Sequence, residues 1–324
     1  MWDFLELYPN SSIDWVVEEQ YVDLLRPLQT HNSFTGINQI IPIALRRWKK
    51  NIFNLNHWCE LFRAIQSLKR QQYNWVIDSQ GLIKSAIVAS FAGRSSSTKI
   101  IGLANATEFS GYEPLARSFY TESVRVPKRC HAIDRSRYLL SSALNIPLID
   151  RSFPVKFYPN SFMAHLTNAS QPPLEFKKPY VLCFHATARE AKKWNIDNWV
   201  FVGKYLLEKG LIPIYPWGNQ AEKNTSHAIV NQLAGGLVPK SYSVNEYFEI
   251  ISLATLTIGV DTGLTHLAAV LNRPTIEIYC DSPLWKTEGY WSDTIINLGD
   301  IGRPPSVTSV IQAVDRLLTN PLAQ

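Results

Sequence analysis

Short apolar runs alternate with segments of helical periodicity along most of this chain. The apolar runs are short enough for buried strands, and the segments between them repeat apolar residues every three or four positions, as amphipathic helices do. This alternation is typical of parallel β-sheets covered by helices on both faces, an α/β fold. The predicted strands are 13–17, 39–45, 74–78, 98–103, 179–186, 211–218, 255–260 and 274–279, and the predicted helices are 57–70, 81–93, 198–210, 221–235, 244–254 and 264–272.

The alternation forms two series, separated by a stretch rich in Pro, Asn and Ser at 157–179. Each series is long enough for a doubly wound domain of ordinary size. We therefore predict a first domain at 1–157, a linker at 158–178 and a second domain at 179–305. A Ser/Thr cap then opens a C-terminal helix at 306–324.

The composition is that of a globular protein, with 46% hydrophobic and 18% charged residues. No run of about 18 apolar residues is present to span a membrane, and the first residues lack the basic and apolar regions of a signal peptide. The four cysteines are far apart in the sequence and form no C-x-x-C pair. We therefore expect reduced thiols in a cytoplasmic protein.

Positive charge is concentrated in the first half of the chain. Residues 1–160 contain 19 Lys and Arg against 13 Asp and Glu, whereas residues 161–324 contain 13 against 14. A basic domain favours an anionic partner, although a scattered and solvated surface would give the same balance.

The segment GVDTGLTHLAAV, 259–270, joins a predicted strand to a predicted helix. A helix N-terminus leaves backbone N–H groups unpaired and carries partial positive charge, so it binds anions, most readily beyond the carboxyl end of a parallel strand. A glycine there lets a ligand approach the backbone, and hydroxyl and imidazole groups add hydrogen bonds. Taken alone, the acid could equally be a helix cap and the histidine a surface residue. The candidate residues of this turn are Asp261, Thr262, Gly263, Thr265 and His266.

Two further loops follow strands of the second series. FHATAREAKKW, 184–194, contains a hydroxyl group at Thr187 and a cation at Lys192. YPWGNQAEKN, 215–224, places Glu222 near the start of a helix. A lysine can hold a phosphate and a carboxylate can accept from ribose hydroxyl groups, although a solvated lysine and a first-turn acid would look the same. With the strand–helix turn, the loops indicate a crevice for a nucleoside diphosphate.

Several common motifs are absent from the sequence. There is no G-x-G-x-x-G of a dinucleotide site and no G-x-x-x-x-G-K-[ST] of a P-loop, and no Cys/His cluster supports zinc. No D-x-D pair is present to hold a diphosphate through a metal ion. We therefore expect no metal and no cofactor, so that Lys192, the helix N-terminus and hydroxyl groups neutralise the phosphate charge.

Together these segments resemble the lipopolysaccharide heptosyltransferases of glycosyltransferase family 9, over nearly the whole chain from Asp14 onward. Within that family, RRW and VIDSQGLIKSA are similar to the enzymes that use Kdo as the acceptor. The matching segments are DWVVEE (14–19), IPIALRRWKK (41–50), VIDSQGLIKSA (76–86), EPLARSFY (113–120), HAIDRSR (131–137), FHATAREAKKW (184–194), PWG (216–218) and VDTGLTHLAA (260–269).

The resemblance implies a GT-B fold, two Rossmann-like domains facing across a cleft, and inverting, metal-independent heptose transfer. The donor would be ADP-L-glycero-β-D-manno-heptose, bound by the second domain, with Lys192 and Asp261 supporting the departing ADP. The family pattern has a second hydroxyl at the position of Ala188 and a methionine at that of Tyr242, whose ring could still stack on adenine. Donor contacts carry over to Thr187, Ala188, Lys192, Glu222, Tyr242, Asp261, Thr262, Gly263 and His266.

The resemblance also implies that the first domain binds Kdo2-lipid A, which carries carboxylate and phosphate groups that guanidinium groups match well. Anionic headgroups could attract the same residues, so we expect a peripheral position on the cytoplasmic face of the inner membrane, and no nucleic-acid partner. A solvated charge run is the alternative for RRWKK. The candidate acceptor residues are Arg46, Arg47, Lys49 and Lys50, expected in a cationic loop beside Trp48, together with Arg135 and Arg137.

The sequence departs from the family at its start. Family members open with an apolar strand and a Gly-Asp turn that carries the catalytic base, whereas this chain begins about where their opening helix ends. We therefore expect the first domain to lack its first strand, and we assign no catalytic base, because neither Asp3 nor Asp14 follows a strand and a glycine. A positioned carboxylate typically contributes about 10²–10⁴-fold in rate, so the chain is expected to bind the donor but to transfer heptose poorly.

Two alternatives remain open from the sequence. The first is an impaired or truncated relative that binds ADP-heptose or lipid A without efficient transfer. The second is a heptosyltransferase II-like enzyme of the same family with another acceptor, against which RRW and DSQGLIKSA argue.

Overall fold

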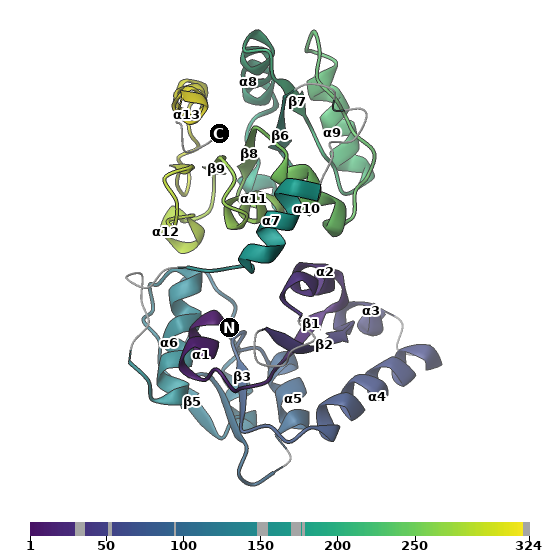
Figure 1. The fold of residues 1–324 in the computed structure, drawn as a ribbon, viewed down its shortest axis with the longest axis vertical. Coiled ribbons are helices and arrows are strands. Elements are labelled where there is room, and N and C mark those ends of the chain that lie inside the picture. Colours follow the sequence, from purple (N-terminus) through teal and green to yellow (C-terminus); the bar gives the residue numbers. More distant parts are fainter. Residues whose placement is uncertain are drawn as a thin grey trace. The chain divides into compact units, whose positions relative to one another are not determined.

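The structure, a computed structural model, describes residues 1–29, 36–50, 54–93, 95–147, 155–169, 176 and 179–319. The chain divides into two compact units, Met1–Lys156 and Phe157–Gln324. Each unit is built from parallel strands with helices packed against them (Figure 1). Within the described residues, no helix combines the length and the apolar character needed to cross a membrane.

The first unit interleaves short strands with helices. Its strands are β1 (Ile13–Glu18), β2 (Ile37–Ile43), β3 (Trp75–Asp78), β4 (Lys99–Leu103) and β5 (Glu122–Val124). Its α-helices are α1 (Trp2–Leu7), α2 (Val22–Leu25), α3 (Leu45–Lys50), α4 (Leu55–Arg70), α5 (Ile83–Ala92) and α6 (Ala132–Leu144), with 3₁₀ turns η1 (Glu19–Tyr21), η2 (Arg26–Leu28) and η3 (Pro114–Phe119).

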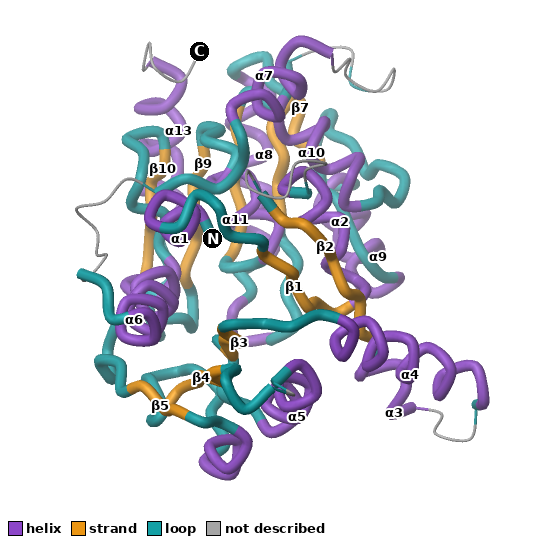
Figure 2. The backbone as a smooth tube through the Cα atoms, turned by 60° about the horizontal axis from the view of Figure 1, so that its bottom comes forward, coloured by secondary structure: helices purple, strands orange, loops and turns teal. Residues whose placement is uncertain are grey.

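The strands of the first unit form two parallel sheets, β1–β2 and β3–β4–β5 (Figure 2). Side chains from both sheets reach one apolar cluster, in which Val16, Ile41 and Val76 pack with residues of α4 and α5. Successive residues of a strand point to opposite faces, so alternate residues of β4 pack instead with α6. The two sheets therefore share one covering layer of helices.

Asp14 belongs to this scaffold. Its carboxylate accepts hydrogen bonds from the Asn38 side chain at 2.8 Å and from the Tyr73 hydroxyl at 2.7 Å. Burial and this carboxylate together raise the pKa of Tyr73 above its ordinary value. The carboxylate thus connects β1 to β2 and to the segment before β3, which is a structural role.

The second unit contains a single parallel sheet in the order β10-β9-β8-β6-β7. Its strands are β6 (Tyr180–Phe184), β7 (Ile212–Ile214), β8 (Leu256–Val260), β9 (Thr275–Tyr279) and β10 (Ile295–Gly299). Its helices are α7 (Asn160–Ala169), η4 (Glu190–Lys192), α8 (Ile196–Glu208), α9 (Gln220–Val230), α10 (Val244–Ser252), α11 (Gly263–Val270), α12 (Leu284–Thr287) and α13 (Val307–Thr319).

Helices cover both faces of this sheet. On one face, Trp199 and Leu206 of α8 and Val310 of α13 are buried against strand residues. On the other face α10 and α11 pack, and Ser243 is the N-cap of α10 and forms a capping box with Glu246. The carboxyl ends of β8, β6 and β7 lie along one edge of the sheet because these strands are neighbours and parallel. Loops that follow them are the expected place for a ligand.

Every strand predicted from the sequence is present, but three other sequence expectations differ from the structure. Strands β5 and β10 were not predicted, because neither forms a long apolar run. The predicted linker at 158–178 contains α7, which packs on α10 through Phe162 and Phe248, with ring centroids 5.3 Å apart. This helix therefore belongs to the second unit. The predicted cationic loop at 46–50 is helix α3.

The close packing of α11 on β8 depends on Gly259. A Cβ atom at this position would lie 2.0 Å from Thr265 Oγ1 and 2.9 Å from Phe184 Cβ. We expect Gly259→Ala to lower the free energy of unfolding by about 1–3 kcal/mol, the usual range for overpacking. Urea unfolding measures this, with Gly263→Ala as the control, because nothing described lies within 4 Å of a Cβ there. Equal stabilities for the two variants would contradict this account of the packing.

Candidate anion-binding site

The turn after β8 leads directly into α11. Thr262 is the N-cap in an extended conformation, and among the described residues its side chain makes no capping hydrogen bond. The position beside Gly263 opens onto free space. The N-terminal N–H groups of α11 are therefore accessible to an anion, as the sequence predicts for such a turn.

Thr265 has a different role from the one expected. Its side chain is fully buried, and its hydroxyl donates to the carbonyl of Val260 at 2.8 Å. It fastens the first turn of α11 to the end of β8. Because the side chain is buried and bonded to the backbone, Thr265 is not placed to donate a hydrogen bond to a ligand.

A cluster of charges surrounds the start of α11. Lys192, from the loop after β6, donates to Asp261 at 2.6 Å. His266, one turn into the helix, lies 2.8 Å from the other oxygen of the same carboxylate. The Asp261 side chain is 9% exposed and that of Lys192 is 20% exposed. Three of the predicted residues therefore form one ion cluster at the carboxyl edge of the sheet.

The cluster changes the proton affinities of its members. Burial alone would raise the pKa of Asp261, but hydrogen bonds with His266 and Lys192 hold it well below its ordinary value. Burial alone would lower the pKa of His266, but hydrogen bonds with Asp261 and with Glu277 raise it from 6.5 to about 10. At neutral pH, Asp261 is therefore an anion and His266 is a cation.

Glu277 was not predicted from the sequence. It lies in β9 with 0% exposure and accepts from His266 Nδ1 at 2.9 Å. Its other oxygen accepts from the Tyr279 hydroxyl at 2.8 Å and from the Gly289 N–H at 3.1 Å. In the sequence, the feature that marks Glu277 is an acidic residue inside the apolar run PTIEIY, 274–279.

Glu222 is engaged within its own loop. Its carboxylate accepts from the Gly218 N–H at 2.7 Å and from the Asn219 side chain at 2.7 Å. In return, Asn219 caps α9 by accepting from the Glu222 N–H at 3.1 Å. The Glu222 carboxylate therefore stabilises the start of α9, and its predicted contact with the ribose stays a prediction. A ribose hydroxyl would have to share or replace these bonds.

The remaining donor candidates lie on loops at the same edge. Thr187 and Ala188 precede η4, between β6 and Lys192. Tyr242 is half-buried, with its ring 6.3 Å from Phe176 and 5.9 Å from Tyr247 between centroids.

His185, at the end of β6, behaves oppositely to His266. It is buried, lies 2.8 Å from the Ser226 hydroxyl, and burial lowers its pKa to about 4. The folded protein keeps this ring neutral while the unfolded chain takes up a proton below about pH 6.5. Stability is therefore lost as the pH falls from about 6.5 to about 4, by up to about 1.4 kcal/mol per pH unit.

Urea unfolding between pH 7 and pH 4.5 tests this expectation. His185→Gln should remove much of the acid-induced loss, because glutamine can keep the bond to Ser226 without titrating. The exposed His227 on α9 supplies the control variant, His227→Gln, which should follow the wild type. The same acid sensitivity in all three proteins would argue against the buried, neutral histidine.

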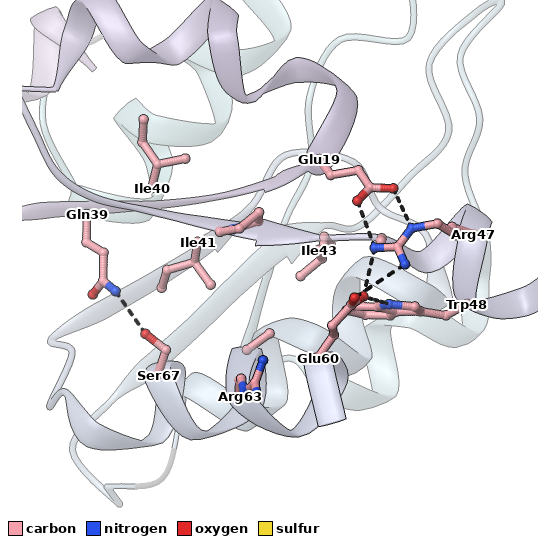
Figure 3. Close-up of a pocket in the computed structure, with 13 residues that line it drawn as sticks. Glu19, Gln39, Ile40, Ile41, Ile43, Arg47, Trp48, Glu60, Arg63 and Ser67 are labelled. Carbon is pink, nitrogen blue, oxygen red and sulfur yellow. Dashed lines mark hydrogen bonds and ion pairs between the residues drawn. The ribbon is translucent and has the colours of Figure 1, made fainter. Parts of the chain in front are cut away.

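In the first unit, Arg47 forms ion pairs with two acidic residues. Its guanidinium donates to both oxygens of Glu19 at 2.9 Å and to Glu60 at 2.7 Å (Figure 3). The Trp48 indole also donates to Glu60, at 2.9 Å. These residues border an open pocket of ≈ 360 Å³ against β2. The Arg47 side chain is 42% exposed within this ion-pair network, and its role in acceptor binding stays a prediction.

The side chains of Arg46, Lys49 and Lys50 lie outside the described part of the structure.

The two arginines of α6 are also engaged. Arg137 is buried and forms two hydrogen bonds with Asp3, at 2.9 and 3.0 Å. Its predicted role in acceptor binding is therefore wrong, since the pair fastens α6 to α1. Arg135 is half-buried and donates to the Ser79 carbonyl at 2.5 Å.

A parallel sheet with a lysine and an open helix N-terminus at its carboxyl edge defines an α/β protein of the doubly wound, ligand-binding class. Residues 61–312 match the family model described as glycosyltransferase family 9 (heptosyltransferase). The chain belongs to this family.

Its relatives agree with that assignment. The chain is 31% identical to lipopolysaccharide heptosyltransferase 1 of Pseudomonas aeruginosa over 278 residues, which are 86% of this chain and 72% of that protein. It is 27% identical to the Escherichia coli K12 protein of the same name over 298 residues, 91% and 86% of the two chains. The solved structure of E. coli heptosyltransferase WaaC with ADP matches with a TM-score of 0.79 at 25% identity, covering 97% of this chain and 92% of that one.

Proposed function

We propose that this chain transfers L-glycero-D-manno-heptose from ADP-heptose to Kdo2-lipid A, the activity of a lipopolysaccharide heptosyltransferase 1. Relatives of that name support the choice of reaction, and structures of the E. coli relative with ADP and with ADP-2-deoxy-2-fluoro heptose support the choice of donor. The observation that carries the proposal is the contact of Lys192 with Asp261 at the start of α11.

The chemistry follows from the charges at this edge. Inverting transfer breaks the bond between the anomeric carbon and the diphosphate while the acceptor hydroxyl attacks from the opposite side. Its proton passes to water, because no residue of this chain is assigned as the base. Negative charge accumulates on the departing ADP. The positive end of α11 and the Lys192 ammonium, which has hydrogens beyond the one given to Asp261, stabilise that charge. Asp261 orients the lysine and is available to heptose hydroxyl groups.

The other donor contacts remain part of the proposal. Thr187 and the backbone of Ala188 supply hydrogen bonds to phosphate oxygens from the loop that carries Lys192. Thr262 and Gly263 present the first N–H groups of α11, and Tyr242 offers an aromatic face to adenine.

The first unit is proposed to bind the acceptor. Kdo carries a carboxylate and lipid A carries phosphates, and residues 1–160 contain the surplus of basic side chains. The candidates for these contacts are Arg46, Arg47, Lys49, Lys50 and Arg135. Such an acceptor would bring the protein to the cytoplasmic face of the inner membrane.

The test is ADP release by the full chain, with ADP-heptose and Kdo2-lipid A supplied together and EDTA present. We expect ADP release and a heptosylated lipid only when both substrates are present, and at a low rate because no catalytic base is assigned. A heptosylated acceptor offered in place of Kdo2-lipid A tests the heptosyltransferase II-like alternative. Calorimetric binding of ADP without any turnover would instead favour the non-transferring alternative, and absence of ADP binding would contradict the proposal.

A further inference from the structure

A carboxylate lies at the centre of the second unit behind the proposed donor site. Glu277 pairs with Gly259 in the register of β8 and β9, and so it lies on the face that α11 covers. It is 0% exposed. A buried carboxylate is costly unless it is paired and hydrogen-bonded. Both of its oxygens have partners: His266 on one side, and the Tyr279 hydroxyl and Gly289 N–H on the other.

The imidazole of His266 lies between two acids. Its Nε2 is 2.8 Å from Asp261 and its Nδ1 is 2.9 Å from Glu277. Ionised carboxylates only accept hydrogen bonds. With both acids ionised, each ring nitrogen donates a hydrogen to its own acceptor, and the ring is an imidazolium. This fixes the orientation of the ring, because each nitrogen has one acceptor.

The cluster contains two basic groups, Lys192 and His266, and two carboxyl groups, Asp261 and Glu277. Glu277 lies deeper than Asp261, on the far side of the imidazole from the turn. If His266 lost its proton, the Asp261 charge beside the proposed diphosphate would be less compensated. An anionic ligand would then bind less tightly.

We propose that Glu277 is a positioning residue: it keeps His266 protonated and turned toward Asp261, and thereby holds Asp261 and Lys192 in the arrangement that accepts the donor diphosphate. This inference rests on the proposed function for the identity of the ligand, although its proton-holding part concerns the ligand-free protein. Two carboxylates face His266, Asp261 after β8 and Glu277 on β9. Lys192 contacts the first and Tyr279 the second.

The first test is the pH dependence of ADP binding by the full chain, measured by calorimetry from pH 6.5 to pH 9. In the wild type, His266 stays protonated across this range, since its pKa is about 10. In Glu277→Gln the amide keeps the shape but not the charge, and the pKa of His266 should fall by about 1–3 units. The affinity of the variant should therefore drop several-fold as the pH rises, while that of the wild type stays nearly flat.

Tyr279→Phe is the matched control. It removes one hydrogen bond from the same buried carboxylate but keeps its charge, so its affinity profile should follow the wild type. A merely structural role for Glu277 would weaken binding equally at all pH values. A pH-independent Glu277→Gln profile, or the same decline in all three proteins, overturns the proposal.

The second test is NMR titration of His266 in the ligand-free protein, which separates this inference from the proposed function. If the wild type binds no ADP, the proposed donor is wrong, and the titration then decides whether Glu277 holds the proton. An unshifted His266 in Glu277→Gln overturns the proposal. Should that variant fail to fold, the wild type alone decides, because a His266 that titrates near pH 6.5 overturns it and one near pH 10 supports it.

Discussion

Replacement of Lys192 by methionine is expected to weaken ADP binding by about 10- to 100-fold, the loss of one charge-assisted hydrogen bond to phosphate, or roughly 1.4–2.8 kcal/mol. Methionine keeps the length of the side chain while removing its charge. The rate of heptose transfer should fall further, because the negative charge on the diphosphate grows as the glycosidic bond breaks. Calorimetry with ADP and a turnover assay measure the two effects separately.

The neighbouring lysine provides a matched control for this variant. Lys193 is exposed and pairs with Glu190 three residues away. Lys193→Met changes the net charge of the protein by the same amount, so any difference between the variants reflects the position of Lys192. Equal ADP affinities for Lys192→Met and Lys193→Met would show that Lys192 does not contact the diphosphate.

Asp261→Asn is expected to lower the free energy of unfolding by about 3–5 kcal/mol, the usual cost of removing one partner from a buried ion pair. The change leaves the partly buried Lys192 and His266 cations facing a neutral amide. The pKa of Asp261 lies below its ordinary value. Its contribution to stability is thus present above about pH 3.8 and is lost as the pH falls toward the lowered value.

Chemical unfolding at pH 5.5 measures this effect. Asp281 offers a comparison, because its partner Arg189 is 65% exposed. Asp281→Asn should cost at most about 1 kcal/mol, as exposed pairs do. If Asp261→Asn were as stable as Asp281→Asn, the ion cluster would not be a stabilising part of the fold.

The sequence predicted that Lys192 and Asp261 lie close together, because chain direction determines where each loop begins. Lys192 and Asp261 each follow an apolar run, and the carboxyl ends of neighbouring parallel strands meet at one edge of a sheet. The strands were predictable for the same reason, since a buried strand reads as an unbroken apolar run. Strand β5 contains Glu122 and Ser123 in only three residues and gives no such signal.

The sequence could not supply the partners of the charged residues. Arg47 pairs with acids 28 and 13 residues away, and Arg137 pairs with Asp3, 134 residues away. A run of basic residues reveals positive charge, but it does not reveal whether a carboxylate far away in the sequence pairs with that charge. For this reason the sequence predicted ligand binding for these arginines. For Glu277 the sequence predicts a buried position, since it lies within an apolar strand. It does not predict the pairing with His266 that compensates the cost of burying this carboxylate.

A crystal structure of the full chain with ADP tests the central claim most directly, that the turn after β8 and Lys192 hold the donor diphosphate. The account predicts phosphate oxygens at about 2.7–3.2 Å from Lys192 Nζ and from the first N–H groups of α11. A well-ordered diphosphate that is bound elsewhere, too far from both groups for a hydrogen bond, would contradict it.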